Sequence, residues 1–126
     1  MDILPLMKQQ YEEIERLCTD RQPAPSKTFE ERLAQLFYFD NEVFFAELPE
    51  DNALKRLRET AHDKQKRLIA KLRAAGSDKT AIYQDALAYC DFHRDKVLPL
   101  VRRSFSHDDL VDFAELFAEM PPAELI

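Results

Sequence analysis

The sequence predicts an all-α protein, an up-down-up-down four-helix bundle with a short fifth helix at its C-terminal end. Only one of its 126 residues is glycine, and Leu, Ala, Glu, Lys and Arg, which favour helices, are abundant. Apolar residues recur at steps of three and four through four segments of about twenty residues, which short connections separate. A chain of this length forms a single domain, which we expect to span residues 1–126.

The first helix should begin after Asp2, a good N-cap residue, and run to about Thr19. Pro5 fits within its first turn, where the backbone has no hydrogen bond to lose. Its inward stripe reads Met7, Tyr11, Ile14 and Cys18. The segment DRQPAPS (residues 20–26) then ends the helix, because its prolines cannot continue it.

A second helix should run from Phe29 to Leu48, with Thr28 and Glu31 forming a capping box at its start. Its inward stripe reads Phe29, Leu33, Leu36 or Phe37, Asp40, Phe44 and Leu48. One carboxylate therefore interrupts an aromatic-rich core face. Sliding the register by two residues would place Glu42 inward instead of Asp40, although the aromatic residues would then turn out of phase. Both registers stay open.

The third helix follows Pro49, which ends the second. Asp51 or Asn52 should cap its start, and Gly76 should end it. His62 lies at the edge of its apolar stripe. This helix therefore contributes one imidazole close to the predicted core.

The fourth helix should be capped by Ser77 or Asp78 and kinked or ended by Pro99. Its inward face reads Ile82, Ala86, Tyr89, His93, Val97 and Leu100. The phenol of Tyr89 and the imidazole of His93 thus share an otherwise apolar face, four residues apart. Such a pair is typical of a metal site or a buried hydrogen-bond network inside a bundle.

A short acidic helix should close the chain. Ser106 with Asp109 predicts its capped start, and the helix should extend from Leu110 to Met120. Its apolar residues can cover one end of the bundle.

The charge is unevenly distributed along the chain. The net charge is −6, yet residues 53–75 carry +6 and the remainder −12. The negative total argues against nucleic-acid binding, and no aromatic residues alternate with the basic ones. This basic helix could dock an acidic protein or pair with the acidic last helix in a homodimer. A monomer with a solvated basic helix is the other interpretation.

The sequence lacks the motifs of common catalytic sites. It has no glycine-rich phosphate loop, no HExxH, no nucleophile elbow and no EF-hand loop, so we expect no enzyme activity. No apolar run approaches the roughly 18 residues of a membrane span, and the start does not read as a signal peptide. Cys18 and Cys90 have no CxxC spacing and should be free thiols. We expect a cytoplasmic protein.

Four segments carry the inward polar residues: MKQQYEEI, LFYFDNEVFFAEL, ETAHDKQKRL and YCDFHRDKVLPLVRRSFSHDDL. With these segments the chain resembles, across nearly its full length, the bacterial hemerythrin-like (HHE cation-binding) proteins. That family has a His in a segment like LxxDHxxI, then HxxxE, another His, and a second HxxxE before a Phe-Pro or Leu-Pro pair. The resemblance implies a four-helix bundle with a metal site inside it.

The resemblance places the family's ligands on Tyr11, Leu36, Asp40, His62, Tyr89 and His93. Only His62 keeps the family's residue, and Asp40 is one methylene shorter than the family's Glu. A dinuclear iron centre needs two carboxylates that each bridge both metals, whereas His93 cannot bridge and Leu36 offers no ligand. The chain should therefore have lost the normal di-iron site.

Two interpretations of the core residues stay open. In the first, Tyr11, Asp40, His62, Tyr89 and His93 form a metal-free hydrogen-bonded core without any cofactor. The domain would then be a non-catalytic binding or regulatory module with an unknown protein partner. In the second they bind one metal ion, either Fe(III), which can deprotonate phenols, or zinc through His62, His93 and Asp40. Neither interpretation makes the chain an enzyme.

Overall fold

The computed structural model describes residues 1–19, 26–74, 76, 78–121 and 123, and these form helices and no strand. In chain order the elements are α1 (Ile3–Thr19), α2 (Lys27–Phe39), η1 (Asp40–Phe44), α3 (Phe45–Glu47), α4 (Asn52–Arg73), α5 (Lys79–Phe92), η2 (His93–Val97), α6 (Leu98–Ser104) and α7 (His107–Glu119). η1 and η2 are π-helical turns. The predicted all-α class is confirmed. In this part of the chain, no helix combines the length and apolar character of a membrane span.

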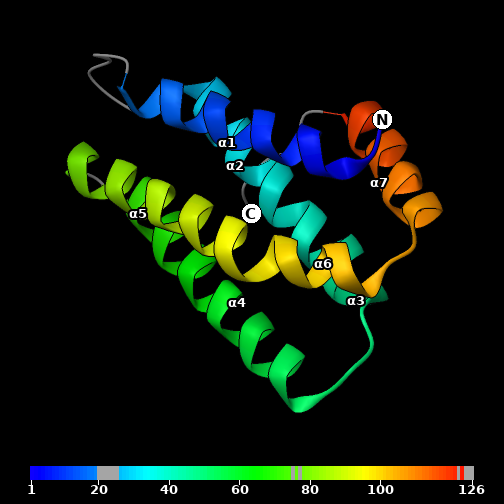
Figure 1. Ribbon diagram of the computed structural model, residues 1–126. Coiled ribbons are helices and arrows are strands. Elements are labelled where there is room, and N and C mark those ends of the chain that lie inside the picture. The colour runs from blue at the N-terminus through cyan, green and yellow to red at the C-terminus, as the bar shows by residue number, and fades with distance from the viewer. Residues whose placement is uncertain (20–25, 75, 77, 122, 124–126) are drawn as a thin grey trace.

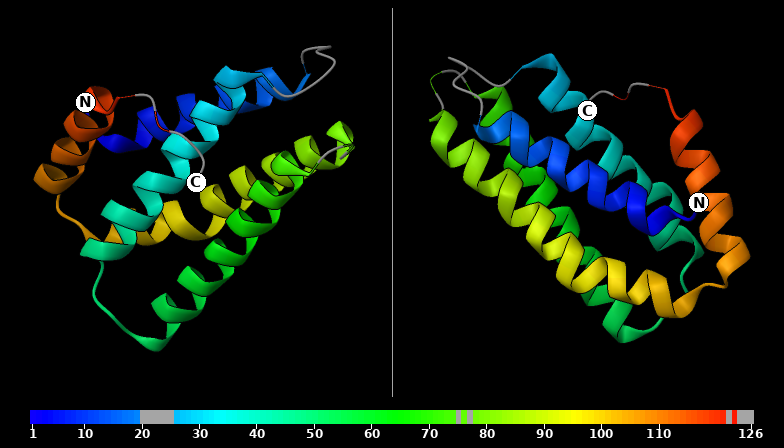
Figure 2. Two further views of the ribbon diagram at one scale, coloured as in Figure 1. Left: turned by 180° about the vertical axis from the view of Figure 1, so that it is seen from behind. Right: turned by 45° about the horizontal axis from the view of Figure 1, so that its top comes forward.

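Two of the helices are long composites that contain a π turn, and Figure 1 shows where their α-helical parts lie. α2, η1 and α3 follow one another without a break, as do α5, η2 and α6. α1 packs against α2, α5 and α7, and α4 runs along α5. α7 lies beside the N-terminal end of α1 (Figure 2). The inward faces of α1, α4 and both composites thus share one interior.

The N-caps predicted for α1, α4, α5 and α7 are confirmed. Asp2 accepts from the N–H of Leu4 at 2.9 Å, and Asp78 accepts from that of Thr80 at 2.9 Å. Asp51, rather than Asn52, caps α4. Ser106 and Asp109 form the predicted capping box at the start of α7. Ser77 lies outside the described residues.

The predicted capping box of the second helix is wrong. The N-cap of α2 is Ser26, whose Oγ accepts from the N–H of Phe29 at 3.1 Å. The helix therefore begins two residues earlier than predicted, and Thr28 lies inside its first turn. The earlier start gains a backbone bond from the N–H of Glu30 to the carbonyl of Ser26. Of the connection preceding α2, residues 20–25 lie outside the described ranges.

Pro99 does not end the fourth helix, as one form of the prediction had it, because the helix continues to Ser104. The π turn η2 precedes Pro99 and closes with a bond from the N–H of Leu98 to the carbonyl of His93. Pro99 thus stands in the first turn of α6, where a missing N–H costs little. A local change of helical geometry accommodates the proline without breaking the rod.

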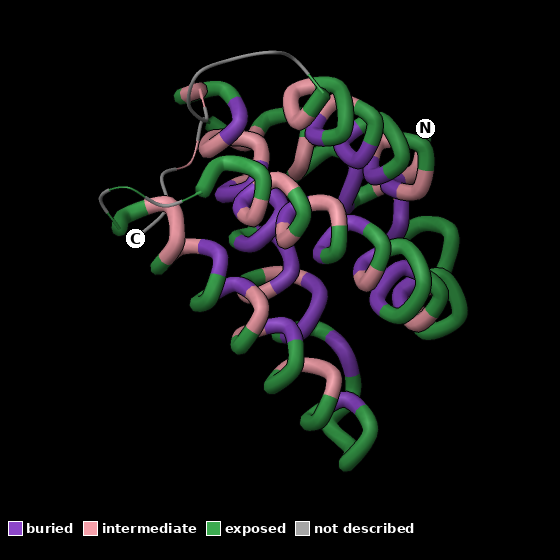
Figure 3. Tube along the Cα trace, turned by 90° about the vertical axis from the view of Figure 1, so that its left-hand side faces the viewer, coloured by how far each residue is buried: buried purple, intermediate pink, exposed green. Residues whose placement is uncertain are grey.

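The core lies along the inner faces of the helices, where the buried residues gather (Figure 3). The predicted stripes account for most of it, including Met7 and Ile14 of α1 and Ile82 and Ala86 of α5. Cys18 and Leu100 are only half-buried.

Of the two registers open for the second helix, the structure has the one that places Asp40 inward. Asp40 is 0% exposed, whereas Glu42 faces outward. The carboxylate enters the core together with Phe44, as the spacing of the aromatic stripe predicted.

Candidate functional site

Two π-helical turns place the central polar pair of the core. Asp40 is the first residue of η1, and its carbonyl accepts the N–H of Phe45. His93 is the first residue of η2, and its carbonyl accepts the N–H of Leu98. Each turn contains one residue more than an α-helical turn, so it shifts the angular position of every residue after it. Both polar side chains therefore stand where their helices change register.

Asp40 and His93 bond directly to each other in the interior. Nε2 of His93 lies 2.6 Å from Oδ1 of Asp40, and both side chains are 0% exposed. The hydroxyl of Tyr89 donates to Oδ2 of Asp40 at 2.6 Å. The hydroxyl of Tyr11, on α1, bonds to Nδ1 of His93. The structure thus brings together four of the five predicted site residues.

The partners of these groups assign their protons. A carboxylate accepts only, so Nε2 of His93 carries the proton that Asp40 accepts, and Nδ1 accepts the hydroxyl proton of Tyr11. Burial, and next the charge of Asp40, raises the pKa of Tyr11 above its ordinary value. The same causes, in the same order, raise the pKa of Tyr89. Both phenols therefore remain protonated donors at neutral pH.

His62, the fifth predicted residue, is not part of this central group. Its Nε2 lies 3.1 Å from Oδ1 of Asn41, and its side chain is partly exposed. Asn41 and Gln65 bond to each other through both ends of their amides, at 2.8 and 3.2 Å. Gln65 also donates to the hydroxyl of Tyr89 at 2.8 Å. Among the described residues, hydrogen bonds link the imidazole to the central group through this amide pair.

Sequence reasoning missed Asn41 and Gln65. The signal for Gln65 was its place three residues after His62 on one helical face, and for Asn41 its position next to Asp40. With these two amides included, every buried side-chain nitrogen and oxygen atom of the described residues has a hydrogen-bond partner. We call the seven linked side chains the core network. It consists of Tyr11, Asp40, Asn41, His62, Gln65, Tyr89 and His93.

Apolar side chains enclose the centre of the core network. The rings of Phe37 and Tyr89 meet edge to face with centroids 4.7 Å apart, and Phe44 packs beside His93. Leu36 is 0% exposed as well. The hydrogen bonds therefore lie in a low-dielectric environment, where the loss of any one of them would lower the stability of the fold.

Asp40 and His93 form a pair of the kind that can act in general base chemistry, but the pair lies in the interior. Both side chains are 0% exposed, and none of the described pockets is lined by either. One small pocket of about 80 Å³ reaches Tyr89 from the surface, beside Lys64 and Asp85. The core network can hold protons in fixed positions, and Tyr89 is the member of it that lines a described pocket.

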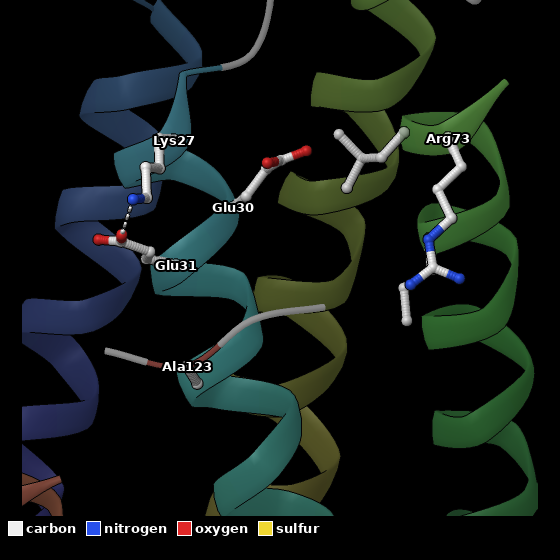
Figure 4. A pocket seen from close by; sticks show the side chains of 7 residues that line it. Lys27, Glu30, Glu31, Arg73 and Ala123 are labelled. Atoms are coloured by element: carbon white, nitrogen blue, oxygen red, sulfur yellow. Dashed lines mark ion pairs between the residues drawn. The ribbon is translucent and has the colours of Figure 1, made fainter. Parts of the chain in front are cut away.

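A larger pocket, of about 520 Å³, lies between the start of α2 and the end of α4 (Figure 4). Its lining mixes charges of both signs, with Lys27 bonded to Glu31 at 3.9 Å and Arg73 on the opposite side. None of the predicted site residues lines it. It offers no link between a ligand and the core network.

The residues present do not fit the di-iron centre that the resemblance implies. Each oxygen of Asp40 already accepts one proton, and both nitrogens of His93 are engaged. Within the described ranges, no three His, Cys, Asp or Glu side chains lie close enough together to hold a metal ion. His62 does not join Asp40 and His93, so the structure does not bring the three predicted zinc ligands together.

The basic helix α4 makes several contacts within the chain. Arg58 pairs with Glu50 at 2.8 Å, and Lys71 pairs with Asp85 at 2.6 Å. Lys64 stands over the ring of Phe92, 5.5 Å from its centroid. Part of the positive charge of this helix is therefore engaged by its own neighbours.

Comparisons with family models, with curated proteins and with solved structures found no match to this chain.

Proposed function

We propose that this chain is a non-catalytic, hemerythrin-like module that binds partners or ligands at its surface. Its long helical segments would form the up-down-up-down bundle, with the core network at the positions where the family holds metal. Neighbouring segments joined by short connections, α1 with α2 and α4 with α5, pack side by side, which supports this topology.

One observation carries the proposal: Asp40 and His93 satisfy each other and the two phenols. A metal-binding imidazole keeps a lone pair for the metal. Here the lone pair on Nδ1 of His93 accepts from Tyr11, and each oxygen of Asp40 already accepts one proton from a side chain of the same chain. Filling a core with a complete polar network fixes how helices sit against one another, because a changed register would leave buried groups unpaired. We therefore assign the network a structural role, without a cofactor.

The two cysteines suit a reducing compartment. Cys18 and Cys90 are free, and burial raises the pKa of each thiol to about 12. Such thiols stay protonated and react slowly. We accordingly place the protein in the cytoplasm.

Metal content tests the proposal. Protein purified without chelator and analysed by elemental mass spectrometry should contain well below one iron, zinc or manganese ion per chain. A chelator should leave the midpoint of thermal unfolding unchanged, because no metal contributes to the folded state.

A single ferric ion bound to the phenols is the outcome that would contradict this. It would appear as near-stoichiometric iron with a visible tyrosinate-to-iron absorption. That absorption would be lost in Tyr11→Phe or Tyr89→Phe and kept in Tyr38→Phe, whose ring is 51% exposed.

We do not extend the proposal to a partner site on α4, because Arg58, Lys64 and Lys71 already contact groups of the same chain. Light scattering at low and high salt tests the alternative. A homodimer that dissociates as salt rises would favour a charged interface, whereas a salt-insensitive monomer would leave the α4 alternative unsupported.

A further inference from the structure

A third pocket combines positive charge with an apolar floor, and it lies outside the core network. It has a volume of about 410 Å³ and is lined by residues of the first half of α1, of η2 and of α6. Leu4, Leu98 and Pro99 supply its apolar surface. This volume falls in the range of small-molecule sites. We call it the α1–α6 pocket.

Four cations surround this floor: Lys8, Arg94, Arg102 and Arg103. Arg94 bonds to Asp91 at 3.0 Å, but the other three make no ion pair with any described residue. This cluster stands out in a chain whose net charge is −6. The helix dipole favours Arg102 and Arg103 at the end of α6, but it does not account for Lys8, which comes from the other wall. The cations thus converge from two helices.

The α1–α6 pocket also touches the core network at one point. The guanidinium of Arg94 lies over the ring of Tyr11, 5.2 Å from its centroid. The hydroxyl of that same Tyr11 bonds to His93. A ligand that engages Arg94 would therefore change the environment of a tyrosine, and the chain has four tyrosines and no tryptophan to obscure the change.

We propose that the α1–α6 pocket binds a single-chain amphipathic anion, with its carboxylate or phosphate on the cationic rim and its apolar chain along Leu4, Leu98 and Pro99. Arginine and lysine bind both headgroups through charge-assisted hydrogen bonds. A purely polar anion would leave the apolar floor in contact with water, and a neutral apolar molecule would make no charge-assisted contact with the cationic rim. Only a ligand with both parts matches both surfaces.

Calorimetric titration of the full chain with decyl phosphate and with decanoate, each below its micelle concentration, tests this inference. We expect saturable binding of at least one of them. Arg102→Gln/Arg103→Gln should weaken it roughly tenfold or more, since two charge-assisted contacts are lost. The matched control is Lys55→Gln/Arg56→Gln, which removes the same charge from exposed positions on α4. This control variant should bind the ligand as the unmodified chain does. Tyrosine fluorescence should change on binding in the control variant and in the unmodified chain.

Four outcomes would overturn the inference. They are no saturable binding, equal binding of the uncharged decyl maltoside, equal loss of affinity in the control variant, and binding only to vesicles of anionic phospholipid. The last would indicate a membrane surface rather than a free amphiphile. Because all the substituted side chains are exposed, circular dichroism should show unchanged folding. Metal found in the core would contradict the proposed function and leave this test unaffected.

Discussion

Asp40 is the group of the core network that can only accept protons, so replacing its carboxylate by an amide rearranges the donors around it. In Asp40→Asn, one side of the new side chain can still accept from His93, but the other side donates toward Tyr89. The hydroxyl proton of Tyr89 then has no acceptor. We expect the free energy of unfolding to fall by about 1–3 kcal/mol, measured by urea denaturation.

Glu42→Gln is the matched control for that substitution. It removes the same charge two residues away, from a side chain that faces outward. Its effect should stay within about 0.5 kcal/mol, as for most surface substitutions. Equal effects at both positions would contradict the assigned role of Asp40.

The two buried phenols should differ in their contribution to stability. Tyr89→Phe leaves an oxygen of Asp40 and an N–H of Gln65 without a partner, whereas Tyr11→Phe leaves only Nδ1 of His93. We expect Tyr89→Phe to destabilise the fold by roughly 1 kcal/mol more than Tyr11→Phe in the same urea experiment. The opposite order would show that the network does not share its hydrogen bonds as described.

The residue pattern predicted the inward direction of Tyr11, Asp40, Tyr89 and His93, because a polar residue at a core position interrupts an apolar stripe and is easily seen. Asn41 and Gln65 left no such signal. An amide is ordinary on a helix surface, and only the neighbouring helix determines whether it meets a partner. The spacing that places Gln65 beside His62 did not by itself show that the two amides link His62 to the rest of the network.

At the scale of helices, the sequence predicted their number and their starts better than their internal geometry. Aspartate and serine side chains at the caps are signals within one helical turn. A π turn instead depends on which residues along the full length of the composite helix have to face the core. Pro99 is the clearest case: its local effect is to end a helix, yet η2 places it in a first turn. The packing of the whole molecule therefore outweighed the local tendency of proline to end a helix.

The start of α2 offers a direct test at this scale. Ser26→Ala removes the oxygen that accepts the N–H of Phe29, so it should destabilise the protein by about 1 kcal/mol. Thr28→Ala should be neutral or slightly stabilising, because Thr28 lies inside the helix and alanine has the higher helix propensity. Thermal unfolding of both variants separates them. A larger loss for Thr28→Ala would restore the capping box predicted from the sequence.

At the scale of the whole molecule, the core network ties together segments that are far apart in sequence. Its bonds join α1 to η2, η1 to α5 and η2, and α4 to both η1 and α5. Apolar stripes alone tolerate rotation and sliding of helices, since one aliphatic contact can replace another. Directional bonds between buried polar groups do not, so the network selects one arrangement from those that the hydrophobic pattern allows.

The same burial makes the whole fold sensitive to alkali. Burial raises the pKa of Cys90 from 9.0 to about 12, and it raises the pKa of Tyr11 and Tyr89 above 10.0. In the unfolded chain these groups lose protons near their ordinary values, while the folded chain retains them. Their contribution to stability is therefore complete below about pH 9 and is lost as the pH rises further.

Urea denaturation from about pH 8 to about pH 11 should accordingly show a free energy of unfolding that falls with pH, most steeply above the ordinary phenol pKa. Each retained proton contributes a slope of about 1.4 kcal/mol per pH unit. Tyr89→Phe removes one such group, so its slope should be shallower by about that amount. Tyr38→Phe, at an exposed position, should keep the original slope. Tyr89 cannot lose its proton without breaking its hydrogen bond to the Asp40 carboxylate. Identical slopes in both variants would therefore mean that Tyr89 releases its proton in the folded state and does not donate permanently to Asp40.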